Sequence, residues 1–376
     1  MCQRTICITG IQACMLLRIA RLGKGLIAIP CDDTSIAPLD GDIHCITDLH
    51  LDSLCNKLHI DDTHPLNLLV PNIESRRWCK TIRTHVLSTT LPNGSFLQLV
   101  PGEDKATRMP IPEGLRILIE SPPLALVQGA RSMQRLVKLH KMSRQAAILR
   151  LMEFADESCG WYVRDPDAPR TGTITYDDPK RCSRLCDVST IRNYIKDITN
   201  VDGITLARLA ARHAIDGTGS PMEAYLHHGL SLPPRYGGLS IKMPLANSQL
   251  QTNDATRAKL KHQSIRPDLQ WPEFHTVAEY LGDKEHAARP ARIEDKDRMQ
   301  DYMVAGYTAF PLMFDDVRNA AALGRTAQMI ARELMRNGAR EELYHVRKIL
   351  NNKDFVARQS ILVATLLPPI TRYGNV

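Results

Sequence analysis

The sequence of 376 residues predicts an α/β protein of the mixed α+β kind, with helices and strands interspersed along the chain. Two observations predict this class. Between residues 1 and 120, short segments of strand composition follow one helical segment. Between residues 220 and 335, the pattern changes from helix to three strands, then helix, strand and a further helix. With 43% hydrophobic residues, the chain can build cores for two or three domains.

The first predicted region, residues 1–120, mixes helix and strand. Apolar positions at helical spacing predict a helix near 9–22. Strand composition predicts strands at 25–29, 66–70, 81–87, 96–100 and 115–119. The turn sequence Pro92-Asn93-Gly94-Ser95 precedes the fourth of these strands. No pattern of catalytic residues stands out in this region.

The second predicted region, residues 121–203, is helical. It contains a long helical stretch over 124–158, opened by Pro122-Pro123, and another helix over 187–198. Basic residues recur every three or four positions on the long helix, at Arg131, Arg135, Lys138, Lys141 and Arg144. On a continuous helix they form a basic stripe suited to the phosphates of DNA. A solvated helix face has the same pattern, so both interpretations stay open.

A pair of acidic residues flanks a predicted hairpin near the middle of the third region, residues 204–335. Two strand-like segments meet at the turn 272–274, and Asp268 and Glu279 lie at their outer ends. If the turn is centred between Glu273 and Phe274, the two acids face each other on one side of the sheet. Facing carboxylates repel, so the pair needs a cation, and Mg²⁺ suits a site with few carboxylates. The hairpin therefore suggests a metal-dependent phosphodiesterase.

The elements around the hairpin follow from local signals. Ser220, Pro221 and Glu223 predict the start of a helix that continues to about 229. A strand over 239–250 and a polar connection over 251–266 precede the hairpin. After it, a charged helix (292–305), a strand (307–314) and a long helix (317–335) are predicted, and the last region, residues 336–376, is expected to be a helical tail.

This order resembles the very-short-patch-repair-like branch of the PD-(D/E)XK nuclease superfamily. The resemblance rests on Ser220-Pro221-Met222-Glu223, on Asp268-Leu269-Gln270-Trp271-Pro272-Glu273, on Ala278-Glu279-Tyr280 and on Asp297-Arg298, and it covers roughly residues 204–335. It implies a restriction-endonuclease-like αβββαβ mixed sheet with flanking helices. It also implies a DNA endonuclease or nickase that uses Mg²⁺.

Carried over residue by residue, the resemblance makes Asp268 and Glu279 the ligands of the metal. Glu223 would hold a second ion or orient a ligand, and His286 would be an acid, a base or a phosphate contact. The chain departs from the signature at Leu281, where the superfamily has lysine and this branch commonly has an acid. Lys284 or His286 would then have to take over the missing role from the following loop.

Simpler interpretations of these residues stay open. Glu223 is also explained as a capping-box residue, and Arg298 as a local partner of Asp295 or Asp301. Three classes of function therefore compete. They are an active nuclease, a degenerate nuclease fold that binds DNA or a protein as a toxin–antitoxin-like regulator, and an enzyme or interaction protein unrelated to nucleic acid. The third class is favoured if residues 239–314 do not form one mixed sheet.

Composition predicts the environment of the protein. The formal net charge of +7 is compatible with a polyanionic partner. The ten cysteines form no C-x-x-C pair, which favours reduced thiols. The apolar run from Ile6 to Leu17 lacks a basic lead-in and ends too early for a membrane span. We therefore expect a cytoplasmic protein with no membrane partner.

Overall fold

The computed structural model describes residues 4–77, 79–166, 173–175, 183–262, 264–281 and 289–368. The chain divides into two compact units. Unit 1 comprises Met1–Ser158 and Val163–Arg212, and unit 2 comprises Cys159–Tyr162 and His213–Val376. Each unit has its own mixed sheet, which confirms the predicted α+β class. Predicted regions 1–120 and 121–203 both fall in unit 1, and the predicted tail, 336–376, belongs to unit 2.

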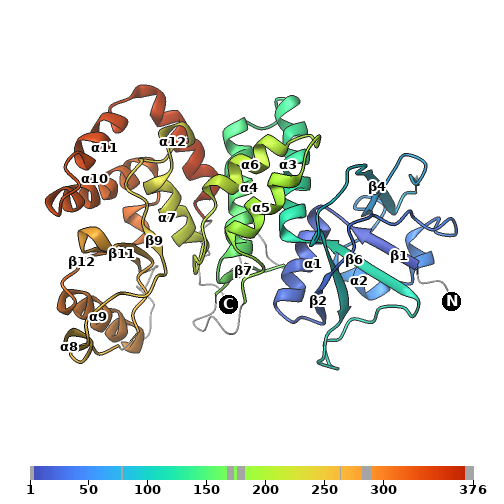
Figure 1. The fold of residues 1–376 in the computed structure, drawn as a ribbon, viewed down its shortest axis with the longest axis horizontal. Helices are drawn as coiled ribbons and strands as arrows, with labels where there is room; N and C mark the ends of the chain where they lie inside the picture. Colours follow the sequence, from blue (N-terminus) through green and yellow to red (C-terminus); the bar gives the residue numbers. More distant parts are fainter. Residues whose placement is uncertain are drawn as a thin grey trace. The chain divides into compact units, whose positions relative to one another are not determined.

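Unit 1 is built on a six-stranded sheet with the strand order β2-β5-β6-β1-β3-β4 (Figure 1). Its strands are β1 (Arg4–Ile8), β2 (Leu26–Cys31), β3 (Leu66–Val70), β4 (Ile82–Val86), β5 (Phe96–Pro101) and β6 (Leu115–Glu120). β1 is parallel to β6 and antiparallel to β3, and β3 is parallel to β4. β4 is therefore an edge strand, while the largely buried β1 and β6 lie inside the sheet.

The apolar run that begins at Ile6 contains two elements rather than one. It forms the end of β1 and, after Gly10, the helix α1 (Ile11–Arg21). Gly10 has a positive φ of 71°, which lets the chain turn sharply between strand and helix. Strand β1 was not predicted, because an apolar run of this length does not reveal where its period changes.

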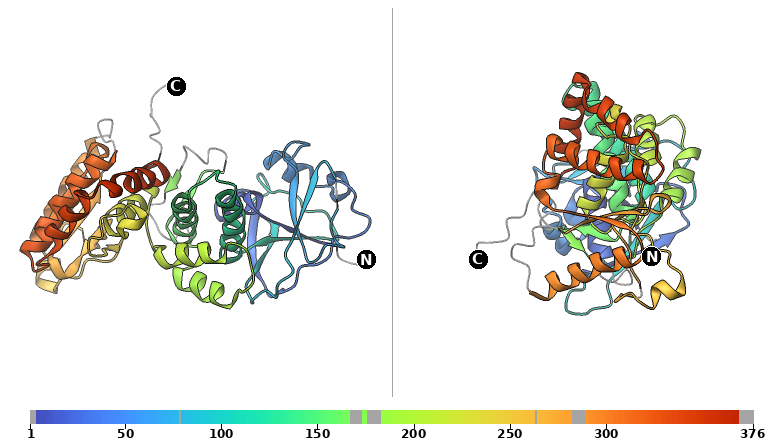
Figure 2. Two further views of the ribbon diagram at one scale, coloured as in Figure 1. Left: turned by 90° about the horizontal axis from the view of Figure 1, so that it is seen from above. Right: turned by 90° about the vertical axis from the view of Figure 1, so that its left-hand side faces the viewer.

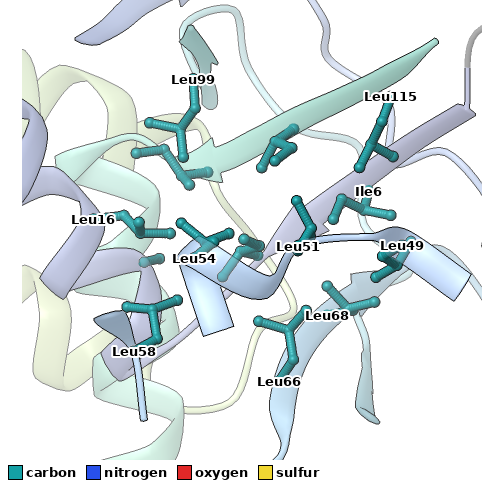
Figure 3. Close-up of a cluster of buried hydrophobic side chains, with 14 of the residues drawn as sticks. Ile6, Leu16, Leu49, Leu51, Leu54, Leu58, Leu66, Leu68, Leu99 and Leu115 are labelled. Carbon is teal, nitrogen blue, oxygen red and sulfur yellow. The ribbon is translucent and has the colours of Figure 1, made fainter. Parts of the chain in front are cut away.

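The core of unit 1 lies between this sheet and the helices α1 and α2 (Asp52–Lys57). Figure 3 shows Leu16 of α1 and Leu54 of α2 beside the strand residues Ile6 and Leu68. The cluster is almost entirely Leu and Ile, as expected for a chain with few aromatic residues. Burial of this apolar surface is the main force that holds the sheet and the two helices together.

The helical stretch predicted over 124–158 is confirmed, but it is divided into two helices and the condition of one continuous helix is not met. The structure has α3 (Pro122–Lys138) and α4 (Arg144–Cys159), separated by a turn in which His140 has a positive φ of 54°. Ser143 then begins α4, because its hydroxyl accepts a hydrogen bond from the amide of Ala146 at 3.1 Å. Unit 1 also contains α5 (Val188–Asp197) and most of α6 (Ile204–His213). The short strands β7 (Tyr162–Arg164) and β8 (Thr173–Thr175) form a separate two-stranded sheet.

Unit 2 is built on a four-stranded sheet with the order β12-β11-β10-β9. Its strands are β9 (Leu245–Ala246), β10 (Leu269–Trp271), β11 (Thr276–Tyr280) and β12 (Thr308–Leu312). β10 is antiparallel to both neighbours, and β11 is parallel to β12. The helix α9 (Arg289–Val304) lies on one side of this sheet, and α10 (Ala320–Arg336), α11 (Glu342–Leu350) and α12 (Lys353–Leu366) lie on the other (Figures 1 and 2).

The long strand predicted over 239–250 is wrong except for Leu245–Ala246. Residues 239–241 instead bond to the end of α7 (Pro221–Ser231): the amide of Leu239 donates to the carbonyl of Gly229 at 3.0 Å, and that of Ile241 to Leu230 at 2.8 Å. These contacts use the backbone groups that a strand would offer to the sheet. The polar connection contains the short helix α8 (Asp254–Arg257).

Two further observations bear on the environment of the protein. In the part of the chain that the structure describes, no helix combines the length and the hydropathy needed to cross a bilayer. Within the described ranges, Cys7, Cys14, Cys31, Cys45, Cys55 and Cys79 are free thiols.

Candidate functional site

The hairpin of unit 2 has the register that the sequence predicts. β10 pairs with β11 so that Leu269 faces Ala278 and Trp271 faces Thr276. Between the strands, Pro272–Phe274 form a single 3-10 turn, and His275 closes it with a positive φ of 45°. The same register, extended by one residue, brings Asp268 opposite Glu279.

The Asp268 and Glu279 carboxyl groups lie together on one face of the sheet. Each carboxyl group acts on the pKa of the other, so the two lie close together. Oδ2 of Asp268 accepts a hydrogen bond from the amide of Tyr280 at 2.7 Å. Glu279 is 2% exposed, and its Oε1 accepts a hydrogen bond from the hydroxyl of Tyr302. The half-buried Asp268 beside the buried Glu279 is the chemical centre of this site.

Glu223 brings a third acid close to this pair. It lies in the first turn of α7, whose N-cap is Ser220 as predicted. Its carboxylate accepts from the amide of Gly219 at 2.6 Å and from the side chain of Asn247 at 2.5 Å. The capping-box interpretation therefore applies only in part, because the amide that Glu223 binds belongs to Gly219 and not to the N-cap residue.

The electrostatics of the site reflect three acids in a buried place. Burial, followed by the charges of Glu223 and Glu279, raises the pKa of Asp268 well above its ordinary value. Burial raises the pKa of Glu279 to about 7, although the Tyr302 hydroxyl, the Arg298 charge and the Asp268 carboxyl act in the opposite direction. Burial also raises the pKa of Glu223. The three groups therefore resist full ionisation unless a cation joins them.

Two residues of α9 complete the site. Nη1 of Arg298 lies 3.9 Å from Oε2 of Glu279, and the buried Tyr302 binds the other oxygen of the same carboxylate. Arg298 and Tyr302 are four positions apart, so both reach from one face of the helix. Sequence reasoning missed Tyr302, and its spacing from Arg298 was the signal that could have found it.

The interpretation of Arg298 as a local partner of Asp295 or Asp301 does not describe its ion pairs. Its guanidinium pairs with Glu279 and, at 3.8 Å, with Glu294. Asp301 instead binds Nδ1 of His262 at 2.7 Å. The tertiary fold brings Arg298 to the acids, and the helical spacing alone could not indicate this.

The remaining predicted residues give a mixed picture. Leu281 follows β11 directly, is half-buried, and still donates its amide to Leu312 at 2.9 Å. Its side chain brings no charge to the position that the nuclease signature gives to lysine. Lys284 and His286 lie outside the described residues, so their predicted roles stay predictions.

The residues at the hairpin fit a cation held by two carboxylates. No group of three or more His, Cys, Asp or Glu side chains within the described ranges has the arrangement of a metal site. Asp268 and Glu279 are nevertheless adjacent, the charge of Glu223 acts on both, and the guanidinium of Arg298 lies 3.9 Å from Glu279. This excess of acidic groups suits Mg²⁺, which commonly uses one or two carboxylates and fills its other positions with water or substrate.

The predicted basic stripe does not form on one helix. Arg131, Arg135 and Lys138 lie on α3, Lys141 lies in the turn, and Arg144 begins α4. Lys138 pairs with Asp202 at 3.3 Å, and Nη1 of Arg131 donates to the carbonyl of Val86 at 2.7 Å. The turn at His140 changes the direction of the chain, so a spacing of three or four no longer places these residues on one face.

Comparisons with known proteins give two relatives and no family. Two uncharacterized proteins of Mycobacterium tuberculosis, MT2308 of strain CDC 1551 / Oshkosh and Rv2248 of strain ATCC 25618 / H37Rv, are each 29% identical over 159 residues. The match covers 41% of this chain and 51% of each relative, so the chain spans about half the length of the curated relatives it matches. No family model and no solved structure matches the chain.

Proposed function

We propose that unit 2 is a Mg²⁺-dependent DNA endonuclease or nickase domain of the very-short-patch-repair-like type, with a restriction-endonuclease-like fold. The observation that carries the proposal is the placement of Asp268 and Glu279 beside each other, at facing positions of the β10–β11 hairpin. Buried acids with raised pKa values that converge from separate elements are typical of functional sites.

The order of the elements supports the same proposal. Among the described residues from α7 to β12, unit 2 has the order helix, strand, strand, strand, helix, strand, with the short α8 and the turn helices between them. Its four strands form one mixed sheet, which argues against a misread resemblance. The acid pair lies on two adjacent strands of that sheet, and Glu223 comes from the helix before it.

The residues of the chain take the following roles in this proposal. Asp268 and Glu279 would hold Mg²⁺, which would supply polarisation of a phosphodiester and activation of water. The amide of Tyr280 and the hydroxyl of Tyr302 fix the orientation of the two carboxyl groups. Arg298 offers a positive charge from α9, where Leu281 offers none.

A second candidate function is a nuclease fold without catalysis, which binds DNA or a protein partner as a regulator. Leu281 favours it, because an apolar side chain cannot stabilise a phosphate or position water. The contacts of Glu279 with Tyr302 and Arg298 also favour it, because they stabilise the carboxyl group without any ligand.

A cleavage assay separates these two functions. The full chain is incubated with supercoiled and linear DNA in Mg²⁺ or Mn²⁺, with a chelator as the blank. We expect nicking or cleavage by the wild type and none by Glu279→Gln or Asp268→Asn. Glu273→Gln is the matched control, because Glu273 is an exposed acid in the turn of the same hairpin and should not matter. Binding of DNA without cleavage would favour the second function, and cleavage that survives both acid variants would exclude this site.

A further inference from the structure

The open edge of the unit 1 sheet gathers arginines from three separate segments. Arg83 lies on the edge strand β4, Arg76 lies in the loop before it, and Arg131 lies on α3. Burial is the main cause of the lowered pKa of His85. The charges of the three arginines lower that pKa further, so all three lie near this histidine. His85 is two positions from Arg83, so both side chains leave the same face of β4.

Backbone contacts hold these segments at the edge. The amide of Arg77 and the hydroxyl of Thr84 are 3.3 Å apart, and the same hydroxyl donates to the carbonyl of Arg77, which ties the loop to β4. Arg131 is tied to the same strand through the carbonyl of Val86. The positive charges therefore converge because of contacts in the fold.

His85 is fixed by a chain of amide groups. Its Nε2 lies 2.8 Å from Oδ1 of Asn67. Nδ2 of Asn67 donates to Gln12 at 2.8 Å, and the side chain of Gln12 donates to the carbonyl of Pro65 at 2.9 Å. This chain leaves Oδ1 of Asn67 as an acceptor, so Nε2 of His85 is the donor and its Nδ1 remains for another contact.

The cluster has no acid to balance it. Within the described part of the chain, no carboxylate forms an ion pair with Arg76, Arg83 or Arg131, and Arg76 and Arg83 are exposed. Three like charges around one oriented histidine repel one another, and an anion relieves this repulsion. Arginines presented on a surface are suited to phosphate groups, which they bind through paired hydrogen bonds.

We propose that this edge of unit 1, formed by Arg76, Arg83, Arg131 and His85, is a docking surface for the phosphate backbone of duplex DNA. The surface is separate from the acid pair of unit 2 and does not depend on cleavage. A backbone fits better than a single small anion because the arginines come from three segments, and neighbouring phosphates would meet them together.

The test is binding of the full chain to a short fluorescent DNA duplex, measured by anisotropy over a series of salt concentrations without divalent metal. The double variant Arg76→Gln/Arg83→Gln should lower the affinity by roughly 10-fold or more and reduce the slope of log affinity against log salt by about 2. The matched control Arg135→Gln/Arg144→Gln removes the same charge from exposed positions of α3 and α4. It should change the affinity less than about 2-fold.

Each other outcome overturns the proposal. Equal losses in the two double variants would mean that only net charge matters. Absence of binding by the wild type, or stronger binding to duplex RNA of the same sequence, would exclude DNA as the occupant. Displacement of the duplex by millimolar inorganic phosphate at constant ionic strength would identify a small-anion site instead. Melting curves of both variants should match the wild type, since the substituted side chains are exposed.

Discussion

Glu279 is held between a proton donor and a cation, with the hydroxyl of Tyr302 on one oxygen and Arg298 near the other. These contacts do not offset its burial, which keeps the pKa near 7. Burial also raises the pKa of Asp268 beside it well above its ordinary value. A pair in this state stores a proton at moderately acidic pH and attracts a cation at higher pH.

The raised pKa of Glu279 predicts how stability depends on pH. Between its ordinary value of 4.5 and about 7, the folded chain keeps a proton that the unfolded chain has lost, so stability falls as pH rises through this window. The wild type should be more stable at pH 5 than at pH 8, with this group contributing on the order of 2 kcal/mol. Urea denaturation of unit 2 at pH 5 and at pH 8 measures this difference in the free energy of unfolding.

The control for this prediction is the double variant Asp268→Asn/Glu279→Gln, in which the part of the pH dependence that comes from the two substituted acids should disappear. Glu120 of unit 1, whose pKa burial raises to about 8, contributes in the same direction and remains in both proteins. Mg²⁺ should raise the denaturation midpoint of the wild type at pH 8 but not that of the variant. An identical pH dependence in the two proteins would contradict the raised pKa values.

The position of Arg298 suggests that its positive charge replaces the one missing at Leu281, and a pair of substitutions tests this. If Arg298 supplies the positive charge at the site, Arg298→Met should reduce DNA cleavage by about 10²-fold, as the loss of one electrostatic contact to a reacting phosphate does. Leu281→Lys in the same chain should restore part of it, because lysine would return a charge to the end of β11. The control Arg318→Met removes an exposed arginine paired with Asp315. Full activity of Arg298→Met would show that the guanidinium is not used.

At the scale of elements, the helices and strands with simple boundaries were predictable. The strand over 66–70 and the helix start at Ser220 follow from local composition and capping, and both are confirmed. The hairpin register is also confirmed, because a short turn leaves few ways to pair two strands. The break in the helical stretch over 124–158 and the failure of the strand over 239–250 occur where backbone groups bond to a turn or to a non-local partner.

A substitution at Gly237 tests how closely α12 packs against the rest of unit 2. A Cβ at Gly237 would lie 2.4 Å from the carbonyl oxygen of Arg358 and 2.9 Å from Cβ of Leu362. Gly237→Ala should therefore destabilise unit 2 by more than the strain of its positive φ, which costs about 1 kcal/mol. Gly306 has a similar φ of 82° with no atom within 4 Å of such a Cβ, so Gly306→Ala is the matched control. Equal losses in chemical denaturation would refute this packing.

At the scale of the whole molecule, the helical tail predicted over 336–376 belongs to the fold of unit 2. Phe355 and Leu362 of α12 are 2% and 0% exposed, and α11 packs along α10. A domain that ends at the boundary of the resemblance would expose these apolar faces to water. The motif therefore marks only part of the unit that must fold.

Truncation tests this dependence. A chain that ends at Arg336 lacks α11 and α12, which pack against α10. It should therefore lose the near-UV circular dichroism of unit 2 and the part of its pH-dependent stability that comes from the acid pair. A chain that ends at Pro368 is the control and should retain both. Retention of both signals in the shorter chain would show that residues 204–335 fold without the tail.

The sequence by itself determined the α+β class, most strand positions and the facing placement of Asp268 and Glu279. These depend on composition, capping and hairpin geometry within a few residues. Only the tertiary structure decided which partners accompany the acids, because the guanidinium of Arg298 and the hydroxyl of Tyr302 reach Glu279 from a helix about twenty residues further along the chain. It also broke the predicted basic stripe and brought Arg131 to Arg76 and Arg83. Local patterns set the elements, while charges separated in sequence meet only after the chain has folded.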